Sequence, residues 1–201
     1  MSVLSRGKIV NKIQSGELIV SPLLDARQIG NSAIDLRMGN IAKMVRARGL
    51  SHIDPRAYIN QDDIHVNEQT KRQKLERHDI PFKEKLLLHP GMLALVPTLE
   101  WIKLPDNIQG VVTARSSWAR EGLSIATATF INPGYSGIVT LELANLGQIP
   151  IELYPGLRLA QIAFYELEID VKEGDMEKSQ FNMAFEPEAG EIIKYDESFL
   201  P

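Results

Sequence analysis

From residue 86 onward the chain is a succession of short apolar stretches, and this pattern constrains the fold more than any other feature. The stretches alternate apolar and polar residues or are rich in β-branched side chains, which is typical of strands. Turn sequences with proline, glycine and asparagine separate them. The expected strands lie at 86–88, 92–96, 108–112, 137–143, 149–153 and 158–165. Many short strands predict an all-β fold of the sandwich or barrel-like kind.

The rest of the chain is more polar. Ser5 is in position to cap a short helix in which Ile9 and Ile13 recur at helical spacing. Residues 56–81 mix basic and acidic side chains, and we expect a polar surface excursion there. Residues 170–201 are expected to form either a tail or a lid that closes over a ligand. A length of 201 residues suits one core, and we expect a single domain over 1–201.

Composition excludes several classes of function. The net charge of −4 provides no broad basic field, so no nucleic-acid partner is expected. No apolar run approaches the roughly 20 residues of a membrane span, and no secretory signal is recognised, so we expect no membrane association and a cytoplasmic location. The chain has no cysteine, which excludes disulfides and thiolate chemistry. Its four histidines lack metal-ligand spacing. No zinc site is therefore expected.

The densest polar cluster lies at residues 114–123. Arg115 and Arg120 flank the hydroxyls of Ser116 and Ser117. Arginine forks and hydroxyl donors suit a polyphosphate, although a short polar helical turn paired with surface acids would have the same composition. The cluster therefore predicts either an anion site or a solvated turn.

Two further features follow within thirty residues of that cluster. In the segment 130–137, proline and glycine allow a tight turn near a ligand, and Tyr135 could stack on a sugar or base. The same segment also fits an ordinary hairpin turn. Alternation then places Thr140 and Glu142 on one strand face and Leu141 on the other. Glu142 either faces solvent or, if its face lines a closed pocket, serves as a proton carrier.

Taken in order, motifs over most of the chain resemble the dCTP deaminase branch of the dUTPase superfamily. The matching segments are 4–5 with 9–16, 31–37, 52–55, 88–91, 98–105, 114–120, 132–137, 141–145 and 155–162. The resemblance implies a distorted β-barrel or jelly roll of the β-clip type. It also implies a homotrimer with active sites between subunits, and metal-independent conversion of dCTP to dUTP and ammonia.

The resemblance also assigns roles to individual positions. Glu142 matches the general base, Ser116 the hydroxyl that helps place the attacking water, and Arg120 the cation beside the catalytic acid. Mg²⁺ would be held by the triphosphate oxygens and not by protein side chains. The remaining positions match nucleotide contacts: Arg115, Ser117, Asn132, Tyr135, Thr140, Leu141 and Gln161.

Two departures from the family pattern keep alternatives open. Asn132 stands where the family has aspartate, and an amide cannot act as a base near neutral pH. This disfavours release of pyrophosphate, so a dUTP diphosphatase or a bifunctional deaminase and diphosphatase is the second hypothesis. The tail lacks the usual Gln/Gly-rich segment, and Lys178 and Gln180 are its candidate nucleotide contacts. A catalytically silent nucleotide-binding protein is the third hypothesis.

Overall fold

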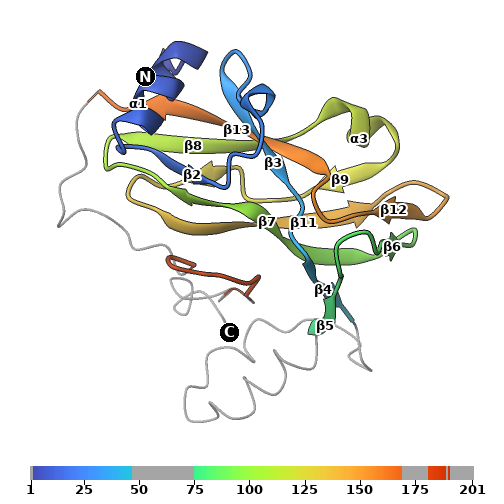
Figure 1. Ribbon diagram of the computed structural model, residues 1–201. Helices are drawn as coiled ribbons and strands as arrows, with labels where there is room; N and C mark the ends of the chain where they lie inside the picture. The colour runs from blue at the N-terminus through green and yellow to red at the C-terminus, as the bar shows by residue number, and fades with distance from the viewer. Residues whose placement is uncertain (1, 47–74, 169–180, 189, 191–201) are drawn as a thin grey trace, which may run out of the picture.

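The structure is a computed structural model that describes residues 2–46, 75–168, 181–188 and 190. Strands dominate it, which confirms the all-β prediction (Figure 1). The elements before residue 80 are β1 Ser2–Val3, α1 Arg6–Gln14, β2 Ile19–Ser21, the 3₁₀ turn η1 Ala26–Gln28, β3 Ala33–Arg37, β4 Ile41–Val45 and β5 Leu75–Asp79. Those that follow are β6 Leu86–Leu88, β7 Leu93–Lys103, β8 Ile108–Ala114, α3 Ser116–Arg120, β9 Leu123–Ile125, β10 Phe130–Ile131, β11 Ser136–Asn145, β12 Ile151–Leu153 and β13 Arg158–Glu166.

The described strands pair antiparallel in open sheets and do not close into a barrel. One sheet has the order β1–β13–β8–β10, with β3 also paired to β13. The other has the order β5–β4–β7–β11–β9, with β2 also paired to β7, and β12 pairs with β6 in a small third sheet. Residues far apart in sequence are thereby joined, because β3 pairs with β13 and β4 with β7.

The hydrophobic core is shared by the two larger sheets. Alternation along each strand sends every second side chain inward. The first sheet contributes Leu36, Val112 and Ile162, and the second contributes Val96 and Leu141, all in one buried cluster. The face of β11 was therefore predicted correctly: Leu141 is fully buried, whereas Thr140 and Glu142 are only partly so.

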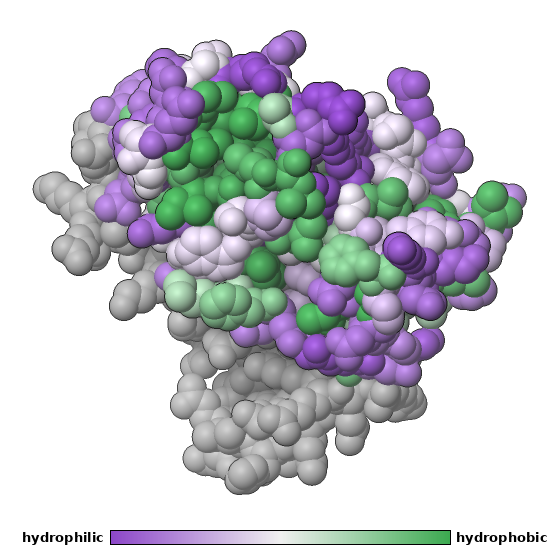
Figure 2. Space-filling view, in the orientation of Figure 1, coloured by the Kyte–Doolittle hydropathy of each residue, from purple (hydrophilic) through white to green (hydrophobic). Residues whose placement is uncertain are grey.

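One face of the molecule carries an apolar area. Figure 2 shows hydrophobic side chains gathered where Figure 1 has β2, β8 and β13, with hydrophilic side chains around them. Val3 of β1 and Ile19 of β2 are among the exposed large apolar side chains. An exposed apolar area with a polar rim is typical of a surface that contacts another protein.

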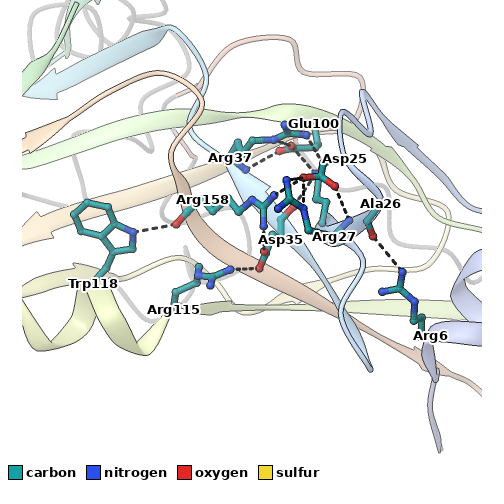
Figure 3. A network of polar contacts seen from close by, with 11 residues as sticks. Arg6, Asp25, Ala26, Arg27, Asp35, Arg37, Glu100, Arg115, Trp118 and Arg158 are labelled. Atoms are coloured by element: carbon teal, nitrogen blue, oxygen red, sulfur yellow. Dashed lines mark hydrogen bonds and ion pairs between the residues drawn. The ribbon is translucent and has the colours of Figure 1, made fainter. Parts of the chain in front are cut away.

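A buried polar network ties the two sheets together (Figure 3). Glu100 of β7 is fully buried and accepts hydrogen bonds from the Arg37 backbone N–H (2.8 Å), Arg37 Nε (2.7 Å) and Gln28 Nε2 (2.8 Å). Arg37 Nη2 donates to Gln28 Oε1 and to the carbonyl of Pro22 (3.2 Å). A buried charge pair of this kind is stable only when its remaining donors and acceptors are also satisfied.

The structure contains the helix and the strands predicted from the sequence, together with further strands. The N-terminal helix appears as α1, with Ser5 at its N-cap position but without a side-chain cap hydrogen bond. Each of the six expected strands corresponds to a strand from β6 to β13. Within 56–81 the described part includes β5, which pairs with β4. Within 170–201, residues 181–188 and 190 are described. None of the described helices is long and apolar enough to cross a membrane.

Candidate functional site

A pocket of about 140 Å³ opens beside β10 and β11. Its lining comes from the loop before β10, from the turn between β10 and β11, from β11 itself and from the segment 181–188. The lining residues are Thr127, Ala128, Phe130, Ile131, Asn132, Tyr135, Val139, Thr140, Glu142, Phe181 and Glu188. Apolar walls with a few convergent polar groups are typical of a small-molecule site.

Glu142 supplies a carboxylate to the pocket, and two hydrogen bonds hold its backbone in place. Its N–H donates to Thr127 Oγ1 (3.1 Å), and its carbonyl accepts from the Ala126 N–H (2.8 Å). Its side-chain atom Oε2 is buried and has no hydrogen-bond partner within the described chain. A buried carboxylate oxygen without a partner is costly. Glu142 is therefore poised to receive a donor from a ligand or from water.

An irregularity between β7 and β11 shapes the pocket wall. Ile138 pairs with Trp101, but Thr140 pairs with Pro97, so the register shifts between them. The Val139 N–H at this point donates to the buried Thr98 Oγ1 (3.0 Å). Val139 and Thr140 both line the pocket, although consecutive residues of a regular strand face opposite sides. The bulge is thus part of the construction of the site.

The turn that contains Asn132 is anchored by Tyr135. The Tyr135 N–H donates to the Asn132 carbonyl (3.2 Å), and its side-chain hydroxyl donates to the Ile138 carbonyl. Burial, with a smaller contribution from the nearby charge of Glu188, raises the pKa of the Tyr135 hydroxyl to about 12. Tyr135 is therefore a neutral donor throughout the range in which enzymes work.

The segment 181–188 forms the fourth side of the pocket. The Met183 N–H donates to the Ser136 carbonyl (2.6 Å), and the Ser136 N–H donates to Asn182 Oδ1 (2.9 Å). The Ile138 N–H donates to the Ala184 carbonyl (3.1 Å). These bonds fasten the segment to the start of β11, and they bring Glu188 to the pocket.

The polar cluster at 114–120 lies at a second place, at the end of β8. Arg115 precedes α3 and forms an ion pair with Asp35 of β3 (Figure 3). Arg158 Nη1 lies 3.2 Å from the other oxygen of Asp35, and Arg158 also accepts a hydrogen bond at its carbonyl from Trp118 Nε1 (2.9 Å). Two guanidinium groups are thus gathered around one carboxylate, which orients them, and Arg158 Nη2 also lies 3.6 Å from Asp25 Oδ2.

The structure brings together some of the predicted site residues and not others. Asn132, Tyr135, Thr140 and Glu142 line the pocket. The side chain of Leu141 lies in the core. Lys178 and Gln180 fall outside the described residues. The other predicted residues do not line the pocket within this chain: Arg115, Ser116, Ser117 and Arg120 around α3, and Gln161 on β13.

The lining residues that were not singled out from the sequence include Thr127, Phe181 and Glu188. Thr127 carries a weak signal, because it precedes the predicted turn by a few residues. Phe181 and Glu188 carry none, because they reach the pocket only through the pairing of the tail with β11. Among the described residues there is no group of three His, Asp or Glu side chains that could hold a metal ion.

Comparison with known proteins shows which family this chain resembles. A dCTP deaminase-like family model matches residues 3–167. The "dCTP deaminase, dUMP-forming" of Methanobrevibacter smithii is 34% identical over 165 residues, which are 82% of this chain and 80% of the relative. The protein of the same name from Methanothermobacter thermautotrophicus is 39% identical over 166 residues, 82% of this chain and 79% of the relative.

A solved structure shows the same fold. The 2′-deoxycytidine 5′-triphosphate deaminase of Agrobacterium tumefaciens superposes with a TM-score of 0.63 at 24% identity, covering 86% of this chain and 50% of the other. The present chain thus spans half the length of that protein. The match of the family model over residues 3–167, together with relatives above 30% identity, leads to one conclusion: the chain belongs to the dCTP deaminase-like family.

Proposed function

We propose that this protein is an enzyme that deaminates dCTP. The observation that carries the proposal is the Glu142 carboxylate, which has a buried oxygen without a partner and lines a pocket of about 140 Å³. The names of the relatives support the choice of substrate, since each is called a dCTP deaminase. A general acid and base aimed into a pocket suits the exchange of an amine for a hydroxyl.

The chemistry requires one group that accepts and returns a proton. Glu142 would take a proton from water and pass it to N3 of the cytosine ring, while the resulting hydroxide attacks C4. Glu142 would then carry the proton of the new C4 hydroxyl to the amine, which leaves as ammonia as the C4 carbonyl forms. The balance is dCTP plus water to a deaminated nucleotide plus ammonia. Mg²⁺ bound to the triphosphate oxygens would offset their charge.

The final product is a separate question, and the relatives favour dUMP. Asn132 led to the expectation of dUTP, because an amide cannot replace a carboxylate as a base. The relatives' names instead describe formation of dUMP, which needs a second water molecule to cleave the bond between the α- and β-phosphates with release of pyrophosphate. We therefore propose dUMP as the product of the complete reaction, with dUTP as an intermediate.

We further propose that the complete site forms between copies of the chain in a homotrimer. Arg115 and the α3 hydroxyls do not line the Glu142 pocket within one chain, although a triphosphate needs cations beside the pocket. A second copy could present its α3 there. The apolar area over β2, β8 and β13 is a surface that association would cover (Figure 2).

Incubation with dCTP and Mg²⁺, followed by separation of nucleotides and measurement of ammonia, tests the activity. We expect ammonia and dUMP from the natural protein, and Glu142→Gln to lower kcat by a factor of 10²–10⁴, roughly the contribution of a general base. Glu84→Gln, at an exposed turn, is the matched control and keeps full activity. Accumulation of dUTP would overturn the proposed product, and binding without ammonia would favour the silent protein.

A mixture of two inactive variants tests the assembly. Glu142→Gln and Ser116→Ala damage the two different parts of the site. In a shared site, random mixing of subunits unites one intact Glu142 with one intact Ser116 in about one quarter of the sites, so activity returns. A site built within one chain stays inactive after mixing. Sedimentation of the natural protein gives the number of subunits independently.

A further inference from the structure

The pocket contains a second carboxylate that lies far from the first in sequence. Glu188 lines the pocket together with Glu142 and Asn132. The two carboxylates differ in their surroundings, because Glu142 has a buried oxygen while Glu188 is an exposed residue at the pocket's edge. The charge of Glu188 is also felt at the Tyr135 hydroxyl, where it contributes to the raised pKa. The pocket is thus an acceptor-rich site with an inner and an outer carboxylate.

The position of Glu188 is fixed by contacts that do not involve its own side chain. Lys43 Nζ donates to the carbonyl of Pro187 (2.5 Å), and Pro187 is buried. Glu186 forms ion pairs with Arg77 and with Lys43 (3.6 Å). These anchors hold the backbone on either side of residue 187 against β4 and β5. The Glu188 carboxylate is left to face the pocket.

The chemistry of the proposed substrate limits what Glu188 can bind. A carboxylate only accepts hydrogen bonds, and near neutral pH dCTP offers two kinds of donor: the exocyclic amine of the base and the 3′-hydroxyl of the sugar. The proposed reaction places the amine at Glu142. A phosphate would be repelled by Glu188, because like charges at short range cost free energy. The sugar hydroxyl is therefore the group that matches the outer carboxylate.

We propose that Glu188 accepts a hydrogen bond from the 3′-hydroxyl of the bound deoxynucleotide and so positions its sugar, a function that Asn132 with its neutral amide would perform less strongly. This inference rests on the proposed function, because it takes dCTP as the ligand. It makes Glu188 a residue that determines specificity for the sugar, and it gives the segment 181–188 a direct part in recognition.

The test compares two nucleotides that differ by the one hydroxyl group. Affinities of dCTP and 2′,3′-dideoxycytidine triphosphate, each with Mg²⁺, are measured by calorimetry for the natural protein, Glu188→Gln and Glu188→Ala, and KM and kcat are measured in parallel. Glu84→Gln is the control: it makes the same chemical change at an exposed turn that does not line the pocket.

We expect the natural protein to bind dCTP at least about tenfold more tightly than the dideoxy compound, since a hydrogen bond to a charged group has about this effect. Glu188→Gln should remove most of that preference by weakening dCTP alone, with kcat within about twofold. Glu84→Gln should keep the preference. Equal weakening of both nucleotides by Glu188→Gln would overturn the inference, since it would reveal only a structural part for the segment.

The binding measurement separates this inference from the proposed function. If the natural protein binds dCTP with the expected preference but releases no ammonia, the proposed deamination fails and the assignment of Glu188 stands. If ammonia is released and Glu188→Gln leaves the preference unchanged, the assignment fails and the deamination stands. If neither nucleotide binds, both fail.

Discussion

Replacement of the buried acid Glu100 gives the sharpest test of what holds the two sheets together. Glu100 is fully buried, and the Arg37 side chain that it pairs with is only 8% exposed. In Glu100→Leu the guanidinium of Arg37 stays buried without its counter-charge. The Arg37 backbone N–H, which donates to Glu100 Oε2, also loses its acceptor. Both losses destabilise the folded state.

The size of the effect follows from these contacts. Breaking a buried ion pair by removing one partner costs about 3–5 kcal/mol. For a chain of this length each kcal/mol lowers Tm by about 2–4 °C, so Glu100→Leu should melt about 6–20 °C below the natural protein. The double variant Arg37→Met with Glu100→Leu removes the stranded charge. It leaves the Arg37 backbone N–H and the buried Gln28 Oε1 without these partners, at a cost of about 1–3 kcal/mol for each unpaired group.

Urea unfolding followed by circular dichroism measures these free energies, and calorimetry gives the melting temperatures. Glu17→Gln is the control, because Glu17 is an exposed acid paired with Lys12 at 2.9 Å and its loss should leave the curve almost unchanged. The reasoning is refuted if Glu100→Leu costs less than about 1 kcal/mol, or if the double variant is no more stable than the single one.

Two further predictions concern the pocket wall. Thr98→Val removes the acceptor of the buried Val139 N–H at the bulge and should lower the free energy of unfolding by about 1–3 kcal/mol, measured by urea unfolding; an unchanged value would show that the hydroxyl is dispensable. Because the folded-state pKa of Tyr135 is about 12 and the unfolded value about 10, its contribution to stability is complete below pH 10 and is lost as the pH rises towards 12. The stability difference between the natural protein and Tyr135→Phe should therefore shrink by about 1.4 kcal/mol per pH unit across that interval; a constant difference would exclude this titration.

Much of the fold could be predicted because the strands from residue 86 onward can be recognised from the local alternation of apolar and polar residues. The predicted strand 92–96 ends one residue before Pro97, and proline has no N–H to donate in a sheet. In the structure β7 continues to Lys103, because Pro97 sits where the register with β11 shifts and its carbonyl accepts from the Gly39 N–H (2.8 Å). A tertiary contact therefore overrides the local rule.

The candidate site likewise contains residues whose position could be predicted from the sequence and one whose position could not. Asn132, Tyr135 and Glu142 lie close in sequence, in the turn between β10 and β11 and on β11 itself, so their gathering in one pocket could be predicted. Glu188 could not, because 46 residues separate it from Glu142 and hydrogen bonds of the tail to β11 bring it there. The local sequence at 181–188 contains no pattern that predicts those hydrogen bonds.

The two acids Glu100 and Glu142 lie on the paired strands β7 and β11 and illustrate opposite uses of burial. Glu100 accepts three hydrogen bonds and should be costly to replace, whereas Glu142 keeps a buried oxygen unpaired. An unsatisfied buried polar atom costs free energy in the folded state. Glu142→Gln should therefore leave the midpoint of urea unfolding unchanged or raise it, even while it lowers kcat for ammonia release by a factor of roughly 10²–10⁴. A fall in the midpoint comparable to that of Glu100→Leu would mean that Glu142 is a structural acid, and the proposed proton transfer would lose its physical basis.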